Sequence, residues 1–427
     1  MSDHAKLSPS GAERWMNCPG SLRMEDGMPD TSSLFADEGT AAHFLASTCL
    51  EQKMDAKAFT GRDILVYQKS GDTKAGTNWA ENCSFGLNKD GRKFTVYDMA
   101  GFVQVYLDNI RQFASGNDLM IEQRVNFSER VGVPDQFGTA DAIILTADGE
   151  ELQIHDLKYG RGVRVDAEEN KQMMLYALGA YDQFAALGDI KRIRMVIHQP
   201  RLEHLSEWDC SVDDLLAFAA VAKKRAFHAI QVMTEKEGAV IHHLVAGDKQ
   251  CKFCKAKAIC PKLAQTVAET TGADFEDLTQ DALPSPGVVT TLDDQMAKVD
   301  LVETWCKAVR AETERRLLEG VPVAGYKLVQ GKQGNRAWMD KAQAEAVLKS
   351  MRIKHEEMYD YEIVSPTTAE KLFKAKIIGP RQWPTLQQLI TRSAGKPSVA
   401  PESDKRGALV LRSADDFETV EEGADLV

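Results

Sequence analysis

The chain of 427 residues is longer than one hydrophobic core usually supports, so two or three domains are expected. Its hydrophobic content of 43% and charged content of 27% are those of a globular protein, and no apolar run approaches the ~18 residues of a membrane span. The formal net charge of −12 argues against a protein that coats nucleic acid through overall basic charge, but it leaves room for an enzyme with a local basic groove.

The first residues, MSDHAKLSPSG, lack the basic and then apolar pattern of a secretion signal. A cytoplasmic location without a membrane partner is therefore expected. In that compartment the eight cysteines should be reduced thiols or metal ligands rather than disulfides.

Hydrophobic periodicity predicts a series of alternating helices and strands in the first part of the chain. In chain order we expect short helices at 7–21 and 37–52, an amphipathic helix at 98–114, a strand at 119–127, two strands within 138–158, a helix at 167–187, a strand at 191–201 and a long helix at 211–238. This order predicts an α/β fold in which helices flank a mixed sheet.

Composition divides the chain into four parts. A first domain is expected over 1–265, a polar and proline-containing linker over 266–290, a small α+β domain over 291–400 and a flexible acidic tail over 401–427. Within the small domain the pattern predicts a helix at 295–320, a hairpin at 325–338 and a helix at 340–353.

Two strands within 138–158 carry the residues with the clearest chemical meaning, Asp141, Asp156 and Lys158. Side chains two apart in a strand share a face, so Asp156 and Lys158 point the same way, and a paired strand can bring Asp141 beside them. Two carboxylates that hold Mg²⁺ and a lysine that positions or deprotonates water suit metal-assisted phosphodiester hydrolysis. The alternative is a solvated ion pair, which the apolar neighbours disfavour.

Four more residues extend this candidate site. Gln172 and Tyr176 are four apart on one helical face and can hydrogen-bond the lysine or the phosphate. His43 would be a further metal ligand that suits Mn²⁺ better than Mg²⁺, and Glu122 would add a carboxylate. Each has a plain alternative: a half-buried tyrosine beside a surface glutamine, a core histidine and an exposed strand glutamate.

Taken together, these residues resemble the PD-(D/E)XK nuclease superfamily, in particular its RecB-like branch with a Q-x-x-x-Y motif. Asp141, the segment DLK and the Gln172/Tyr176 pair match that pattern in order, EGTAAH resembles the histidine motif before the core, and TAD stands in place of the strict Pro-Asp dipeptide. The resemblance spans about residues 8–265. It implies a restriction-endonuclease-like core.

The resemblance also implies roles for single residues. Asp141 and Asp156 would bind Mg²⁺ or Mn²⁺, with His43 and the backbone carbonyl of Leu157 completing the shell. Lys158 would activate water, while the glutamine and tyrosine of the Q-x-x-x-Y motif orient the lysine and the phosphate.

A cysteine cluster follows the predicted core. Cys251, Cys254 and Cys260, in CKFCKAKAIC, make an incomplete tetrahedral site. A subset of the nucleases that the chain resembles carries a [4Fe–4S] cluster on one cysteine before the core and three after it, which implies Cys18 as the fourth ligand. Such a cluster would close a long loop. Structural Zn²⁺ is the alternative, and the other four cysteines are expected to be core residues.

The function that follows is a metal-dependent DNA nuclease, an exonuclease that acts on single-stranded or duplex ends. The whole chain is also similar to a phage- and prophage-encoded family of unassigned function. This implies DNA replication or recombination, with phage single-strand-binding or helicase proteins as partners. Two alternatives stay open: a non-catalytic DNA-end-binding or replication-assembly module on the nuclease scaffold, and a zinc-stapled RNA-processing enzyme.

Overall fold

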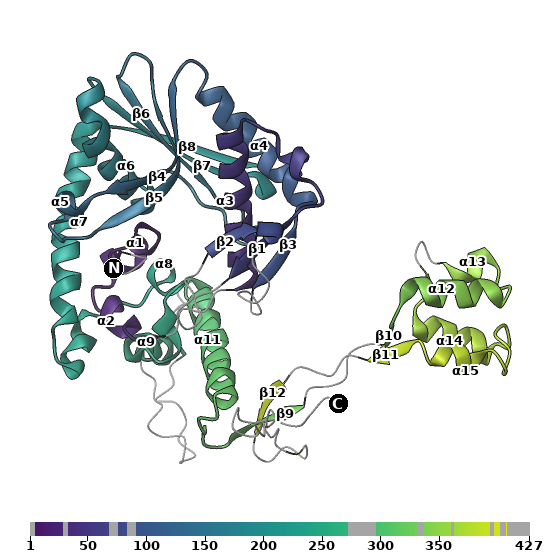
Figure 1. Ribbon diagram of the computed structural model, residues 1–427. Coiled ribbons are helices and arrows are strands. Elements are labelled where there is room, and N and C mark those ends of the chain that lie inside the picture. The colour runs from purple at the N-terminus through teal and green to yellow at the C-terminus, as the bar shows by residue number, and fades with distance from the viewer. Residues whose placement is uncertain are drawn as a thin grey trace, which may run out of the picture. The chain divides into compact units, whose positions relative to one another are not determined.

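A mixed sheet of five strands, in the order β4-β5-β6-β7-β8, lies at the centre of the first part of the computed structural model (Figure 1). The structure describes residues 5–28, 33–67, 76–82, 91–271, 296–330, 336–359, 363–392, 397–401 and 407. The chain divides into two compact units, Met1–Trp305 and Cys306–Val427, and each is described by itself.

The sheet combines an antiparallel meander with one parallel pair. Its strands are β4 (Asp118–Asn126), β5 (Phe137–Leu145), β6 (Glu151–Leu157), β7 (Arg192–Gln199) and β8 (His204–Ser211). β4, β5 and β6 pair antiparallel, β6 and β7 pair parallel, and β8 returns antiparallel to β7. A parallel pair needs a crossover connection, and α6 provides it between β6 and β7. The expected mixed sheet flanked by helices is confirmed; β8 is a strand that the periodicity did not indicate.

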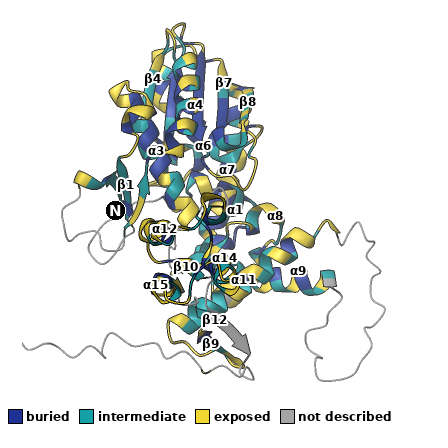
Figure 2. Cartoon of the chain, turned by 90° about the vertical axis from the view of Figure 1, so that its right-hand side faces the viewer, coloured by how far each residue is buried: buried dark blue, intermediate teal, exposed yellow. Residues whose placement is uncertain are grey.

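Helices cover both faces of this sheet. The helices of the first unit are α1 (Ala12–Asn17), α2 (Ser21–Glu25), α3 (Leu34–Gln52), α4 (Asp98–Phe113), α5 (Ser128–Val131), α6 (Lys171–Phe184), α7 (Val212–Met233), α8 (Asp248–Cys251) and α9 (Pro261–Thr271). α6 and α7 pack on one face and α3 and α4 on the other (Figure 1). Since both faces and both edges of β6 are covered, all seven of its residues are buried. Figure 2 colours such buried residues dark blue, whereas the edge strands β4 and β8 are mostly intermediate or exposed.

A small antiparallel sheet, in the order β2-β1-β3, adds to the α3/α4 side. Its strands are β1 (Asp63–Tyr67), β2 (Gly76–Trp79) and β3 (Arg92–Thr95). Ile64 and Val66 of β1 and Trp79 of β2 enter the same core as α3 and α4, which anchors both helices over the larger sheet.

The first unit continues beyond residue 265, the predicted end of the first domain. Leu263 and Val267 of α9 pack with Leu301, at the start of α11 (Val299–Leu318). The predicted linker 266–290 therefore begins inside α9, and its residues from 272 onward lie outside the described residues.

The second unit is a small mixed α and β structure. Its elements after α11 are β9 (Tyr326–Gln330), β10 (Arg336–Trp338), α12 (Lys341–Ser350), α13 (His355–Met358), α14 (Pro366–Lys374), α15 (Trp383–Gln387), β11 (Ile390–Arg392) and β12 (Pro397–Pro401). Trp338 packs in its core and donates its indole N–H to the carbonyl of Val364 at 2.8 Å. Of the predicted acidic tail, 401–427, only residues 401 and 407 are among those described.

The predicted hairpin at 325–338 is wrong in its pairing. β9 pairs with β12, and β10 pairs with β11. Two short strands close in sequence can form a hairpin, but the backbone groups of these two are satisfied by strands that come more than fifty residues later. The pairing therefore depends on contacts that local patterning does not encode.

None of the helices within the described ranges combines the length and the hydropathy needed to cross a bilayer.

Two histidines on β6 and β7 are enclosed under α4. The Nδ1 atom of His155 lies 3.0 Å from Nε2 of His198, and Nε2 of His155 lies 3.0 Å from Oε1 of Gln153. The rings of Phe113 and Tyr106, both from α4, cover the pair. Burial lowers the pKa of His198 to about 4, and burial together with the charge of His198 holds the pKa of His155 well below its usual value.

We predict that the free energy of unfolding falls as the pH drops from 6.5 to about 4. Over that interval the unfolded chain binds a proton at His198 that the folded chain does not bind, so acid favours the unfolded state by up to about 3 kcal/mol. Urea unfolding of the protein and of His198→Gln across this range measures the effect, and the variant should show the shallower slope. Equal slopes would mean that the histidine is protonated in the folded protein.

Candidate active site and cysteine site

The candidate active site forms where β5 and β6 stop pairing. The last paired residues are Ala142 and His155, so Asp141 lies opposite Asp156 just beyond the ladder. There the carboxylate Oδ2 of Asp141 accepts the backbone N–H of Leu157 at 2.6 Å. The side chain of Asp141 thus replaces the next backbone hydrogen bond between the strands. The pairing of β5 with β6 ends there, next to the two carboxylates.

Lys158, immediately after β6, is the centre of a hydrogen-bond network. Its Nζ lies 2.9 Å from Oδ2 of Asp156 and donates to Oε1 of Gln172 at 3.0 Å. The amide Nε2 of Gln172 donates to Oδ1 of Asp156 at 3.2 Å and to the hydroxyl of Tyr176 at 3.1 Å. The predicted face of α6 therefore points at the lysine, and Gln172 fixes the lysine and the aspartate at once.

Gly138 on β5 makes room for this network. A Cβ at that position would lie 2.5 Å from Cε1 of Tyr176 and 2.7 Å from Cγ of Pro9, closer than real Cβ contacts allow. The absence of a side chain lets the tyrosine ring approach the strand directly. Sequence reasoning did not identify this residue, although its place three residues before Asp141 in GTAD was a usable signal.

A second group lies on the other side of Asp141. Single ligand atoms of His43, Glu122 and Asp141 all lie within 4.8 Å of one another, and Nδ1 of His43 is 3.0 Å from Oδ1 of Asp141. Glu122 is opposite Asp141 in the β4–β5 register, but the ladder skips this pair, and its φ of +48° is in the left-handed region. Such backbone conformations are disfavoured for side chains other than glycine and cluster at functional sites.

Electrostatics tie the two groups together. Burial alone would lower the pKa of His43, but the charge and hydrogen bond of Asp141 outweigh it and raise that pKa to about 9. The same pair lowers the pKa of Asp141 against the opposing effect of burial. Burial, only partly offset by Lys158, raises the pKa of Asp156. Desolvation and the charge of Asp141 raise the pKa of Glu122, whose side chain still reaches solvent, to about 7.

The donor set fits a divalent cation. An imidazole nitrogen and two carboxylate oxygens suit Mn²⁺ or another first-row metal, and a carboxylate pair also suits Mg²⁺. His43, Glu122 and Asp141 are the residues placed to hold it. Asp156, also expected as a ligand, contacts Lys158 and Gln172 in this structure, and its role as a ligand stays a prediction.

Four thiols meet at a different place. One small cavity is lined by Cys18, Cys251, Cys254 and Cys260. The backbone N–H of Val245 lies 3.3 Å from Sγ of Cys18, and that of Gly247 lies 3.4 Å from Sγ of Cys251, contacts that would stabilise thiolates. The fold thus brings the distant Cys18 to the three cysteines of CKFCKAKAIC.

Burial of these thiols raises the pKa of Cys18 to about 11 and that of Cys254 to about 12. Without a cation the thiols of Cys18 and Cys254 are protonated at neutral pH, so a metal would displace protons from them on binding. All four are free cysteines rather than disulfide-bonded. Of the remaining cysteines, Cys49 and Cys210 are buried and Cys306 is half-buried, while Cys83 lies outside the described residues.

Polar contacts join the N-terminal helices to the cysteine segment independently of any metal. Arg14 pairs with Glu25 at 3.0 Å, and Oε1 of Glu25 accepts the backbone N–H of Lys255 at 2.7 Å. The N–H of Gly20 donates to the carbonyl of His243 at 3.0 Å. The thiol site therefore lies on a preformed junction between two ends of the first unit.

A family model described as a protein of unknown function (DUF2800) matches residues 4–407. The chain belongs to the DUF2800 family. A solved structure described as "Crystal structure of SSO0001" aligns with 37% of this DUF2800 chain and 66% of its own chain, at 16% identity and a TM-score of 0.21. A likeness at that TM-score carries no argument about the fold.

We predict that this DUF2800 protein binds Mn²⁺ through Glu122 and Asp141. Replacing Glu122 by glutamine removes an anionic ligand and should weaken the affinity by at least about tenfold, since even partners of metal ligands are worth that much. Isothermal titration calorimetry of Mn²⁺ into the protein measures it. Glu129→Gln, at an exposed glutamate of α5, is the matched control; equal affinities of the two variants would contradict the assignment.

Proposed function

We propose that the protein is a Mg²⁺- or Mn²⁺-dependent deoxyribonuclease of the PD-(D/E)XK type, which hydrolyses phosphodiester bonds at DNA ends. The observation that carries the proposal is the closed network of Asp156, Lys158, Gln172 and Tyr176 beside the candidate cation ligands His43, Glu122 and Asp141. These residues come from α3, three strands and α6. A purely structural ion pair would not require residues from so many elements to converge.

The chemistry divides between the two groups. A bound cation supplies Lewis-acid activation of the phosphate and of a water molecule. Lys158 donates to the carboxylate of Asp156 and to the side-chain carbonyl of Gln172, which leaves one of its three N–H groups for water or a phosphate oxygen. In that position the lysine orients the nucleophile and offsets the negative charge that develops on the phosphate.

The topology supports the same proposal. A meander of β4, β5 and β6 followed by a helical crossover to the parallel β7 puts Asp156 and Gln172 at the same end of the sheet. This is the arrangement that a restriction-endonuclease-like core requires. With the DUF2800 membership, we extend the proposal to an exonuclease in phage DNA replication or recombination, assisted by single-strand-binding or helicase proteins.

We further propose that the four-cysteine cavity holds a [4Fe–4S] cluster. The cavity gathers one cysteine from before the sheet and three from after it, which is the arrangement that the resemblance to cluster-bearing nucleases implies. Four thiolates suit a [4Fe–4S] cluster, and structural Zn²⁺ is the alternative.

Replacing Lys158 by alanine should lower DNA cleavage at least ~100-fold, the usual contribution of a positioned catalytic group. Because the lysine is assigned to the reacting phosphate rather than to overall affinity, DNA binding measured in EDTA, where no cleavage occurs, should persist. Cleavage of end-labelled single-stranded and duplex DNA with Mn²⁺, together with fluorescence anisotropy, measures both. Lys224→Ala, at an exposed lysine of α7, is the control.

Three outcomes would count against the proposal. A Lys158→Ala variant that cuts as fast as the parent would reject the role of the lysine. DNA that the parent protein binds but never cuts, with either metal, would favour the end-binding module. Cleavage confined to RNA would favour the RNA-processing alternative.

The cysteine proposal predicts a coloured protein. Anaerobically purified protein should absorb near ~400 nm, as thiolate-bound iron does, and Cys18→Ala should lose this absorption and its iron. Cys210→Ala, at a buried cysteine away from the cavity, should keep both. A colourless parent protein that contains stoichiometric zinc would show that the four cysteines bind zinc rather than an iron–sulfur cluster.

A further inference from the structure

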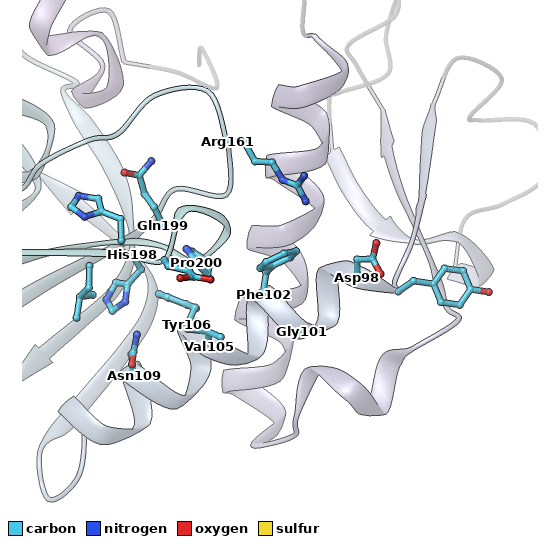
Figure 3. Close-up of a pocket in the computed structure, with 14 residues that line it drawn as sticks. Asp98, Gly101, Phe102, Val105, Tyr106, Asn109, Arg161, His198, Gln199 and Pro200 are labelled. Carbon is cyan, nitrogen blue, oxygen red and sulfur yellow. The ribbon is translucent and has the colours of Figure 1, made fainter. Parts of the chain in front are cut away.

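A cavity of about 760 Å³ opens beside the candidate active site (Figure 3). It lies between α4 and the segment that joins β7 to β8, and its volume is within the usual range for small-molecule sites. The residues that matter below are Phe102, Tyr106, Arg161, His198 and Gln199.

The cavity and the lysine site are neighbours through the backbone. β6 and β7 run parallel with Leu157 beside His198, so both strands end at the same end of the sheet. The N–H of Lys158 donates to the carbonyl of His198 at 2.8 Å. The wall of the cavity is therefore one hydrogen bond away from the residue that positions the nucleophile.

Aromatic and guanidinium groups meet at this cavity. The guanidinium carbon of Arg161 lies 5.8 Å from the centre of the Phe102 ring, and that of Arg201 lies 5.9 Å from it. Arg201 also lies 4.7 Å from the ring of Tyr159 and is fixed by Glu38 at 2.8 Å. Of these residues, Phe102 and Arg161 line the cavity. A ring for stacking beside a cation for a phosphate is a combination with which proteins hold single-stranded nucleic acid.

Two enclosed polar atoms at this cavity lack partners. Tyr106 and His198 are 1% and 2% exposed, and their rings meet edge to face at 5.0 Å. Neither the hydroxyl of Tyr106 nor Nδ1 of His198 has a hydrogen-bond partner among the described residues. Leaving such groups unpaired is costly. Both residues line the cavity, so the wall beside β7 carries polar side chains and is not purely apolar.

We propose that this cavity accepts one nucleobase of the DNA strand, splayed out of its stack next to the phosphodiester that is cut. The base stacks on Phe102 in the space lined by Tyr106 and His198, and Arg161 contacts the adjoining phosphate. The inference rests on the proposed function for its substrate. It adds a subsite that makes single-stranded ends better ligands than a fully paired duplex.

An abasic scan tests the subsite without cleavage. Short single-stranded oligonucleotides, each with one abasic position near an end, are bound to the full-length protein in EDTA and followed by anisotropy. One position should stand out, with about tenfold weaker binding than the intact strand, the size of one base–aromatic stack. In Phe102→Leu the intact strand should bind as weakly as that abasic strand binds to the parent.

Phe94→Leu is the matched control, because Phe94 is half-buried against the same core as Phe102 and does not line the cavity. A flat abasic scan, or equal losses in the two variants, would overturn the subsite even if the protein cleaves DNA. A position-specific loss in a protein that never cleaves would keep the subsite and reject the nuclease. If a free deoxynucleoside monophosphate competes as well as the intact strand does, the ligand of the cavity is a mononucleotide rather than a DNA strand.

Discussion

The structure depends on how negative charge is accommodated where β5 and β6 separate. Asp141 and Asp156 are opposite each other and largely enclosed, and two such carboxylates repel unless positive charge lies beside them. Each has its own cation in the described structure, His43 for one and Lys158 for the other. A divalent ion at the first position would replace a proton on the imidazole. At the second position Lys158 stays paired with Asp156.

The fold provides this balance by drawing on both faces of one sheet. His43 comes from α3 on one face and Gln172 from α6 on the other, and β6 connects the two sides. Successive residues of a strand point to opposite faces, so Asp156 joins the lysine network while His155 joins the buried histidine pair under α4. One strand thereby contributes to the candidate active site and to the histidine pair that includes His198 of the cavity wall.

The cysteine site has a different role in this architecture. Cys18 follows α1, whereas the other three thiols follow α7, so a metal bound by all four would link the two ends of the first unit. Cross-linking distant positions restricts the unfolded chain most when the loop between them is long. Ion pairs and backbone hydrogen bonds already form this junction. The bound group would therefore further stabilise a junction that protein contacts already form.

The sequence by itself determined the elements that follow a local period: the meander, the crossover helix and the long α7, and with them the strand positions of Asp141 and Asp156. Spacing of four also placed Gln172 and Tyr176 on one face, because a helix repeats every 3.6 residues. Only the tertiary structure decided the rest. It put Glu122 with His43 and Asp141, exposed the cavity beside β7, and paired β9 with β12. Such contacts join segments whose approach is set by packing and long-range strand pairing, which no local pattern of residues encodes.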